Sequence, residues 1–308
     1  MKDLAGIIRL EIATHGSIPF SRFMELALYH PQFGYYTREH DPFGKHGDFF
    51  TAAQLQPVFG RLIGRLARHL LDPLQARDIV DLGAGRCEMA EAFEGFHYLP
   101  LDVAKGQLPA TIRGLVFANE FFDALPVDVF EARGHRLHPR HVTFDAETQR
   151  FEWTTIASSD AAGIEDGCIV ERCPSLEPWL ERLHSSIETG YVLVIDYGYT
   201  ERERLRLPQG TLMSYSRHQA LEDVLDSPGE RDITAHVNFT SLHESAVNIG
   251  FQVEWFESLA ATLLRAGKRD DFAGVLEGDD FRNRQLLKTL LYGMGETFRT
   301  MLLSKNVR

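Results

Sequence analysis

Residues Ile79–Cys87, IVDLGAGRC, decide the fold class that we expect for this chain. A short apolar run that ends in a tight turn is typical of a buried parallel strand. Glycine lets the backbone turn sharply and approach a ligand closely. The stretch therefore predicts the first strand of an α/β domain, followed by a ligand loop at Gly83, Ala84 and Gly85.

Strands and helices alternate along the rest of the chain. Apolar runs predict strands at Tyr98–Val103, Leu115–Ala118, Tyr191–Asp196 and Phe251–Trp255. Helical periodicity appears at residues 20–28, 59–70, 89–93, 176–187, 242–249, 259–264 and 286–291. This order predicts a Rossmann-like α/β fold with a mostly parallel sheet and with ligands at the carboxyl ends of its strands.

We expect one structural unit with three parts. An N-terminal helical lid with an aromatic loop spans residues 1–75, and the Rossmann-like core spans 76–256, with a β-hairpin insertion at about 128–156. A helical segment at 257–308 should pack on the core. Only residues 103–114, 12 in number, separate Asp102 from Leu115, which is close to the minimum for a parallel crossover. The edge strand after Asp102 is therefore expected to be missing.

The composition excludes several classes of function. Lys and Arg number 32 against 44 Asp and Glu, so the net charge of −12 argues against nucleic acid as a partner. Three cysteines without a CxxC motif indicate a reducing compartment. The sequence has no apolar run of the ~18 residues that a membrane span needs. We expect a bacterial cytoplasmic protein without membrane insertion, or a mitochondrial matrix protein only if a transit peptide has been removed.

The glycine turn and the next strand together predict a cofactor. Asp102 follows Gly85 by 17 residues and ends the second strand, where a carboxylate can accept hydrogen bonds from ribose hydroxyls. The third glycine of a dinucleotide fingerprint is missing, which disfavours an NAD-dependent oxidoreductase. Asp81 before two glycines suits S-adenosyl-L-methionine, whose ammonium needs an acceptor. No metal is expected, because His135, His138 and His141 alternate faces in a hairpin.

The third strand ends in a second candidate group. Asn119–Phe122 reads N-E-F-F, without the prolines that a DNA amino-methyltransferase carries in its N-P-P-aromatic tetrapeptide. Carboxylates beside a methyl donor suit a cationic acceptor, because a guanidinium binds a carboxylate through two hydrogen bonds. We expect Glu120 to be the first catalytic candidate and Asp123 the second. The alternative stays open that both carboxylates cap the start of a helix.

Seven motifs occur in order along nearly the whole chain. They occupy Ile18–Tyr36, Gly47–Thr51, Asp81–Arg86, Phe117–Val127, Val194–Tyr199, Asp232–Thr240 and Gly293–Phe298. Together they resemble those of the MidA/NDUFAF7-type methyltransferases, which are the mitochondrial complex I assembly factor class and its bacterial relatives. The resemblance implies a class I S-adenosylmethionine-dependent methyltransferase fold. For the mitochondrial members it also implies symmetric dimethylation of a protein arginine on a complex I subunit. Cys87 and Asp102 depart from the Gly and Glu that are common in the family.

The expected partners follow from this resemblance. They are a protein substrate with an arginine side chain, of which a respiratory complex I subunit is one candidate, and a second copy in a homodimer stays open. Further cofactor-binding candidates are Asn119, Gly47, Phe50 and Thr51, and substrate-binding candidates are Tyr35, Tyr36, Glu171 and His236. The two tyrosines are equally well explained as core aromatics.

The alternative function is a cofactor-binding assembly chaperone of a respiratory complex, with weak or no catalysis. Cys87 in the cofactor loop and the short region after Asp102 keep this alternative open. Transfer of a labelled methyl group to protein distinguishes an enzyme from such a chaperone.

Overall fold

The computed structural model describes residues 3–38, 56–102, 106–157, 164–216, 219–221, 223–268, 272, 274–275 and 281–307. The chain divides into two compact units, each built from three separate segments. Unit 1 comprises Met1–Phe49, Ala124–Leu176 and Glu201–His236, and unit 2 comprises Phe50–Asp123, Glu177–Thr200 and Val237–Arg308. The boundaries that we expected near residues 75 and 256 do not coincide with these.

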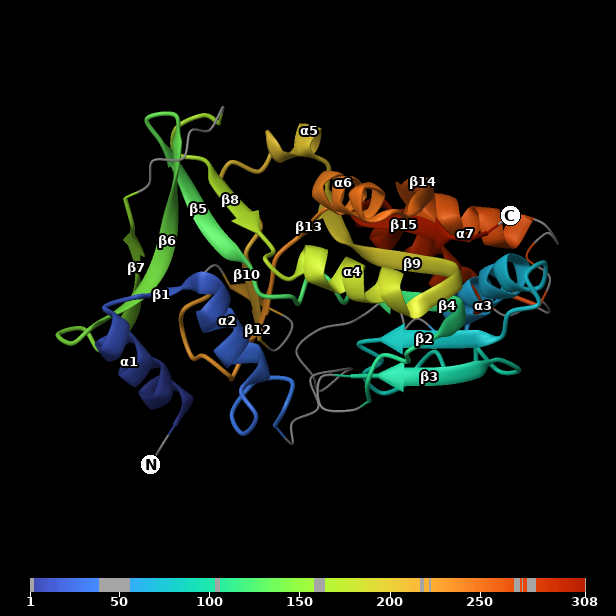
Figure 1. Cartoon of the computed structure of the whole chain (residues 1–308), viewed down its shortest axis with the longest axis horizontal. Coiled ribbons are helices and arrows are strands. Elements are labelled where there is room, and N and C mark those ends of the chain that lie inside the picture. The colour runs from blue at the N-terminus through green and yellow to red at the C-terminus, as the bar shows by residue number, and fades with distance from the viewer. Residues whose placement is uncertain are drawn as a thin grey trace. The chain divides into compact units, whose positions relative to one another are not determined.

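Unit 2 contains a mostly parallel sheet with the strand order β14-β15-β9-β4-β2-β3, and β13 also pairs with β9 (Figure 1). Strands β3, β2, β4 and β9 pair in parallel, and β15 joins β14 to β9 by antiparallel pairing. The bounds are β2 (Asp78–Leu82), β3 (His97–Leu101), β4 (Ile112–Asn119), β9 (Ile187–Tyr199), β13 (Val237–Asn238), β14 (Gln252–Ser258) and β15 (Phe298–Lys305).

Strand β3 forms one edge of this sheet. Among the described residues it pairs with β2 alone, and the chain enters β4 after a short link. The expectation of a sheet without an edge strand after Asp102 is therefore confirmed for the part of the chain that the structure describes. The Rossmann-like α/β class is confirmed with it.

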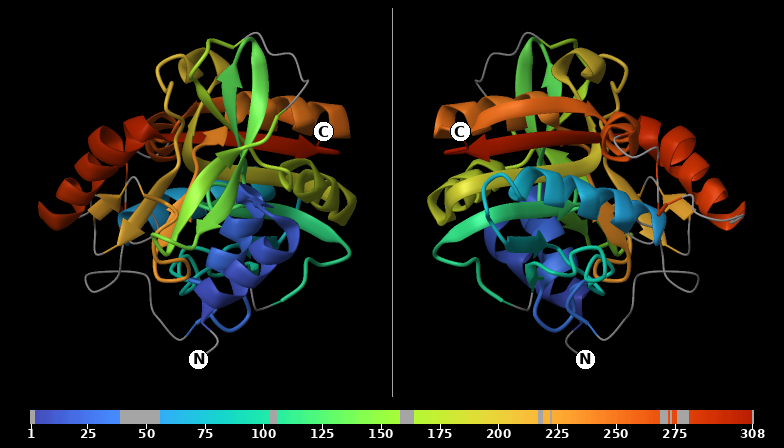
Figure 2. Two further views of the ribbon diagram at one scale, coloured as in Figure 1. Left: turned by 90° about the vertical axis from the view of Figure 1, so that its left-hand side faces the viewer. Right: turned by 90° about the vertical axis from the view of Figure 1, so that its right-hand side faces the viewer.

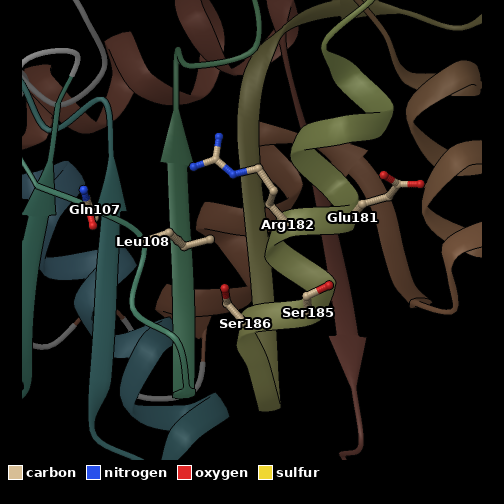
Figure 3. Close-up of a pocket in the computed structure, with 6 residues that line it drawn as sticks. All are labelled: Gln107, Leu108, Glu181, Arg182, Ser185 and Ser186. Carbon is tan, nitrogen blue, oxygen red and sulfur yellow. The ribbon is translucent and has the colours of Figure 1, made fainter.

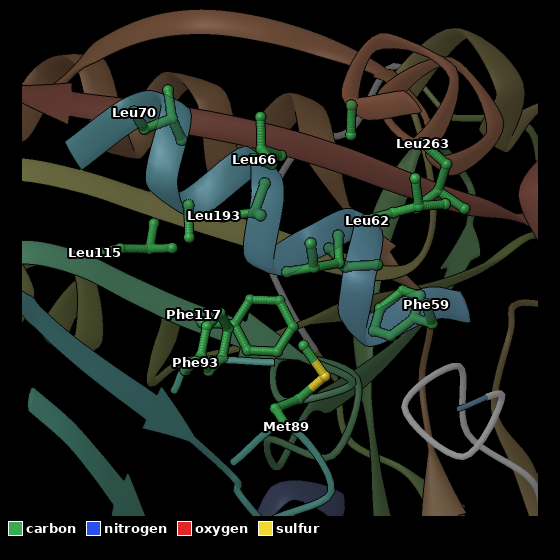
Figure 4. Close-up of a cluster of buried hydrophobic side chains, with 14 of the residues drawn as sticks. Phe59, Leu62, Leu66, Leu70, Met89, Phe93, Leu115, Phe117, Leu193 and Leu263 are labelled. Carbon is green, nitrogen blue, oxygen red and sulfur yellow. The ribbon is translucent and has the colours of Figure 1, made fainter. Parts of the chain in front are cut away.

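One helix supplies more of the core that lies against the sheet than any other described helix. Helix α3 (Val58–Leu71) places Leu62, Leu66 and Leu70 against Leu115 and Leu193 of the central strands (Figure 4). Helix α7 (Leu259–Gly267), α8 (Phe281–Lys288), the π-helix η3 (Thr289–Met294) and the short α9 (Gly295–Thr297) follow around the same core. Helices α4 (Leu176–Ser186) and α6 (Phe239–Ile249) complete the helices described in unit 2.

Unit 1 is built on antiparallel strands. Its five-stranded sheet has the order β1-β6-β5-β8, with β7 paired to β6 (Figure 2). The bounds are β1 (Ile18–Pro19), β5 (Asp128–Arg133), β6 (Arg136–Asp145), β7 (Arg150–Thr155) and β8 (Ile169–Arg172). Helix α2 (Phe20–Tyr29) packs on it through Phe20 and Trp153, whose ring centres are 4.9 Å apart. The unit also holds α1 (Leu4–His15), α5 (Glu201–Arg204), β10 (Met213–Ser216), β11 (Gln219–Leu221) and β12 (Asp232–Thr234).

Two expectations about local structure were wrong. Residues 89–93 form successive turns instead of a helix, although Met89 and Phe93 are buried in the core as the periodicity requires. Cys87 with φ 59° and Gly95 with φ 88° interrupt helical backbone on either side of this segment. Residues 257–308 are not only helical, because they contain β15.

The β-hairpin expected at about 128–156 is present. Strand β5 pairs with β6 and β6 pairs with β7, both antiparallel, within the five-stranded sheet.

Two absences concern only the residues that the structure describes. None of the described helices is long and apolar enough to cross a membrane. The same residues contain no cluster of three or more His, Cys, Asp or Glu side chains with the geometry of a metal site.

Strands β4 and β9 pack closely where two glycines face each other. Gly114 is paired with Gly190, and a Cβ atom on Gly114 would overlap the carbonyl oxygen of Asp78 in β2. We expect Gly114→Ala to lower the free energy of unfolding by about 1–3 kcal/mol, because the overlap forces backbone shifts in the core of the sheet. Chemical denaturation followed by circular dichroism measures this change.

Gly293→Ala is the matched control for this substitution. Its Cβ would meet only the Thr289 Cγ2 atom, at 3.9 Å, and the residue lies in helical backbone. We expect an unchanged or slightly raised stability, since alanine favours helix over glycine. Equal losses in both variants would contradict the close packing of β4.

Candidate functional site

The register of the parallel strands brings four chain segments to one edge of the unit 2 sheet. Leu82 of β2 is opposite Leu101 of β3 on one side and Ala118 of β4 on the other. Asn119 of β4 is opposite Ile195 of β9. The residues that follow these positions, Gly83, Asp102, Glu120 and Asp196, therefore form a row at the carboxyl end of the sheet.

The glycine loop adopts backbone conformations that favour glycine. Gly83 has φ 69° and Gly85 has φ 50°. Residues that have a Cβ atom rarely adopt these backbone angles. Between them the Ala84 N–H donates to the Leu101 carbonyl oxygen at 3.0 Å, so the loop is tied to the end of β3. A Cβ on Gly83 would lie 3.3 Å from the Phe121 ring. The loop thus offers a cradle of bare backbone beside the end of β3, and its role in cofactor binding stays a prediction.

Asp81 is buried directly before this loop. The Tyr98 hydroxyl donates to Asp81 Oδ2 at 2.6 Å, which links β2 to β3. Burial raises the pKa of Asp81 to about 7, and the Tyr98 hydrogen bond opposes this rise. Asp81 is therefore part of the buried contact between the two strands, while Asp102 at the end of β3 is exposed.

Asn119 and Glu120 form a linked pair at the end of β4. Glu120 has φ 52°, its N–H donates to the Ile195 carbonyl oxygen at 2.9 Å, and its Oε1 accepts from Asn119 Nδ2 at 3.0 Å. The Oδ1 atom of Asn119 is buried without a hydrogen-bond donor from the described protein. Such a buried acceptor costs about 1–3 kcal/mol unless a donor reaches it. A bound ligand with an N–H or O–H group would supply that donor.

Asp123 is buried, in contrast to the partly exposed Glu120. The alternative of a helix-capping pair does not apply, since residues 121–127 are turns and no helix begins there. The structure thus brings both predicted carboxylates to the same turn but gives them different environments.

Asp196 is a candidate that the sequence analysis missed. It is fully buried, and it accepts from the backbone N–H groups of Phe122 at 2.9 Å, Asp123 at 3.3 Å and Tyr197 at 2.9 Å. Burial raises its pKa, and the three N–H groups oppose the rise. The available signal was an acid at the end of an apolar run, the same pattern that identified Asp102.

The predicted substrate-binding residues lie in unit 1, whereas the residues above lie in unit 2. Tyr35 is fully buried in the core of unit 1, and the Tyr36 hydroxyl donates to Asp232 Oδ1 at 2.8 Å. Both contacts agree with the core-aromatic alternative. Their role in substrate binding stays a prediction.

Glu171 and His236 are also held within unit 1, and both contact Thr211. Glu171 Oε1 accepts from the Thr211 N–H at 2.6 Å, and the His236 N–H donates to Thr211 Oγ1 at 3.0 Å. Burial raises the pKa of Glu171 and lowers that of His236. Three predicted cofactor-binding residues, Gly47, Phe50 and Thr51, fall outside the described residues.

An open pocket of about 590 Å³ lies against α4 in unit 2 (Figure 3). Gln107 and Leu108 precede β4, and Ser185 and Ser186 end α4, so these lining residues lie toward the amino ends of β4 and β9. The glycine loop lies at the opposite ends of the parallel strands. Glu181 and Arg182 complete the lining, and no predicted site residue belongs to it.

The glycine cradle leads to a test of ligand binding. We expect Gly83→Val to abolish binding of S-adenosylmethionine, because its side chain occupies the space that the ligand needs and meets Phe121. Asp102→Ala should weaken binding by about 1.5–3 kcal/mol, the usual contribution of a hydrogen bond to a charged group. Isothermal calorimetry measures both changes.

Gly95→Val is the control for backbone strain. Gly95 also has a left-handed φ, 88°, but a Cβ there meets no atom within 4 Å. We expect a similar loss of stability and full binding. Normal affinity in Gly83→Val and Asp102→Ala would remove this loop and this strand end from the binding site.

The raised pKa of Asp81 makes stability depend on pH. The Asp81 carboxyl ionises near its ordinary pKa of 3.8 in the unfolded chain and near 7 in the folded one. Because the folded chain holds the proton more tightly, the free energy of unfolding falls as pH rises from about 4 to 7. We expect Asp81→Asn to stabilise the chain by about 2–4 kcal/mol at pH 8 and little at pH 4. Denaturation at both pH values measures the difference.

Asp145→Asn should change stability in the opposite direction. The Glu147 N–H lowers the pKa of this exposed carboxyl. The ionised Asp145 therefore adds to the free energy of unfolding above the pKa of the unfolded chain, and this stabilisation disappears as pH falls. Equal behaviour of the two variants would show that burial does not govern the ionisation of Asp81.

Comparison with known proteins agrees with the geometry of this edge. Residues 94–257 match a family model described as "Putative S-adenosyl-L-methionine-dependent methyltransferase". A Burkholderia thailandensis crystal structure with bound S-adenosylhomocysteine superposes with a TM-score of 0.88 at 29% identity, over 99% of this chain and 92% of that one. A native structure of a protein from the same organism gives 0.84 at 29% identity, with the same coverage of both chains.

Two curated relatives are mitochondrial proteins named protein arginine methyltransferase NDUFAF7. The Rattus norvegicus protein is 26% identical, and the match covers 77% of this chain and 68% of the relative. The Danio rerio protein is 27% identical, and the match covers 80% of this chain and 71% of the relative. With the glycine cradle and the buried Asn119 acceptor fitting the ligand, this chain belongs to the MidA/NDUFAF7-type family of S-adenosylmethionine-dependent methyltransferases, and S-adenosylmethionine is its cofactor.

Proposed function

We propose that this methyltransferase modifies arginine side chains of a protein substrate. The observation that carries the proposal is the partly exposed Glu120 carboxylate, which follows β4 at the same edge of the sheet as the glycine loop. A guanidinium is a cation with a pKa above 12 and pairs with a carboxylate through two parallel hydrogen bonds. The names of the NDUFAF7 relatives support the same acceptor class.

The residues at this edge have separate tasks in the proposed reaction. Gly83 and Gly85 leave room for the cofactor, and Asp102 accepts from its ribose. When bound, S-adenosylmethionine supplies the sulfonium methyl group for in-line displacement by a nitrogen. Glu120 orients the guanidinium, stabilises its positive charge as the C–N bond forms and the S–C bond breaks, and accepts the proton that the nitrogen loses. Alignment of the nitrogen with the methyl group supplies most of the rate enhancement. A nitrogen held in this position needs no strong base.

Asn119 contributes to this arrangement through both ends of its amide. Its Nδ2 donates to Glu120 Oε1, and its buried Oδ1 accepts no hydrogen bond from the described residues. The opposite amide orientation would direct Oδ1 at the Glu120 carboxylate, so the contact with Glu120 determines which atom is left for the ligand. An N–H of the cofactor or of the acceptor satisfies that oxygen.

The partner in this proposal is a protein, and the resemblance to the assembly factor class makes a respiratory complex I subunit one candidate. The alternative is an assembly chaperone that binds the cofactor with weak or no transfer. Purified chain, labelled S-adenosylmethionine and protein from a deletion strain distinguish the two. We expect labelled methylarginine by mass spectrometry. Label on another residue type would contradict the arginine acceptor, and cofactor binding without labelled protein would favour the chaperone.

Substitution of Glu120 tests its role directly. We expect Glu120→Gln to lower turnover about 10²–10³-fold, the usual loss for one transition-state stabiliser. The affinity for S-adenosylmethionine should change much less, since the charge matters mainly in the transition state. Asp123→Asn should show a smaller loss. Single-turnover methyl transfer and the melting temperature are measured together.

Glu91→Gln is the matched control, because it removes an exposed acid from unit 2 in the turns that follow the glycine loop. It should retain full turnover. Full turnover in Glu120→Gln as well, with a changed melting temperature, would assign Glu120 a structural role and remove it from the mechanism.

A further inference from the structure

Asp196 is a buried carboxylate without a cationic partner among the described residues. Its side chain is fully buried in β9, and the ion pairs found in the described chain do not include it. An uncompensated buried charge is costly and needs hydrogen bonds in place of a counter-ion. Here three backbone N–H groups provide them.

Two of these N–H groups belong to the turn that carries Glu120. Asp196 Oδ2 accepts from Phe122 and Asp123, while Oδ1 accepts from Tyr197 in its own strand. The preceding residue, Ile195, accepts from the Glu120 N–H. Two consecutive residues of β9, Ile195 and Asp196, therefore accept hydrogen bonds from three backbone N–H groups of the turn.

The turn needs this support because of its backbone conformation. Glu120 has a left-handed φ of 52°, which costs about 1–3 kcal/mol for a residue with a side chain and persists only where surrounding contacts enforce it. Without Asp196, the buried N–H groups of Phe122 and Asp123 would lose their acceptor. The turn would then relax, and the Glu120 carboxylate would move with it.

We propose that Asp196 is a positioning residue that fixes the Glu120 carboxylate through the backbone of the 120–123 turn. This inference rests on the proposed role of Glu120 and deepens it. Asp196 itself has no contact with substrate in this account. It acts as the acceptor that sets the geometry of the turn before any ligand binds.

The inference predicts a specific pattern of substitutions. We expect Asp196→Asn to lower kcat about tenfold, since an amide keeps one oxygen for the turn but presents an NH₂ group to another N–H. Asp196→Ala should lower kcat about 10²-fold, the scale of loss that a displacement of about 1 Å can cause. The affinity for S-adenosylhomocysteine should stay within about threefold in both variants.

A double-mutant cycle separates positioning from a general structural effect. If Asp196 acts through Glu120, Asp196→Asn should lower kcat less than twofold when Glu120→Gln is already present, because interacting residues are not additive. Independent losses that multiply would overturn the inference. Unchanged kcat in the single Asp196→Asn variant would also overturn it.

Hydrogen exchange provides a readout that needs no activity. The amides of Phe122 and Asp123 should exchange faster in Asp196→Asn and Asp196→Ala than in the parent chain, without ligand. Ser304→Ala is the control, since it removes a buried hydrogen bond to Glu254 Oε1 in the same sheet. It should lower the melting temperature and leave both kcat and these amides unchanged. Unaltered exchange of these two amides in the Asp196 variants would contradict the role of Asp196 in holding the 120–123 turn.

Failure of the proposed function has a different signature. Full turnover of the single Glu120→Gln variant would refute the role of Glu120, whatever the Asp196 variants do. A strong loss in Glu120→Gln with a multiplicative loss in the double variant would refute only the positioning role. If Asp196→Ala does not fold, the exchange and kcat of Asp196→Asn decide the question.

Discussion

The parallel pairing of β2, β4 and β9 is the constraint on which the site depends. This register brings Gly83, Glu120 and Asp196 to one edge of the sheet, although they lie far apart along the chain. A shift of β4 by one residue would turn Leu115 and Phe117 away from α3. The same packing that buries the core therefore determines which polar groups meet at the carboxyl edge.

Acidic groups dominate that edge. Asp81 and Asp196 are buried beneath it, Asp123 is buried in the turn, and Asp102 and Glu120 reach solvent. The buried carboxylates are compensated by Tyr98 or by backbone N–H groups, with no lysine or arginine salt bridge to either Asp81 or Asp196 among the described residues. A field of this sign favours cationic ligands. It suits a sulfonium cofactor and supports the proposed guanidinium acceptor.

Local sequence patterns predicted the part of the fold that local physics determines. The apolar run before Gly83 and the acid after Leu101 identified β2, β3 and the glycine loop, because strand burial and turn chemistry leave signals within a few residues. The short link after Asp102 predicted the missing edge strand in the same way. Glu120 could be found because it ends an apolar run.

The remainder depends on contacts between distant segments. Strand β15 shows no clear alternation, and its place between β9 and β14 follows from long-range pairing. The turns at 89–93 show that an apolar period can report burial without a helix. Asp196 was missed because its role depends on the hydrogen bonds that it accepts from the backbone N–H groups of residues 122 and 123. No short window of sequence contains both partners.

The position of β15 has a consequence for how the chain is made. Residues 298–305 pair with β9 on one side and with β14 on the other. A ribosome synthesises them after every other strand of the sheet, so the edge of β9 that pairs with β15 stays unpaired from the completion of β9 at Tyr199 until β15 is made. Exposed edges of apolar strands pair readily with other chains. The nascent protein therefore exposes an apolar strand edge until residue 305 has emerged, and shortening the chain before β15 would make that exposure permanent.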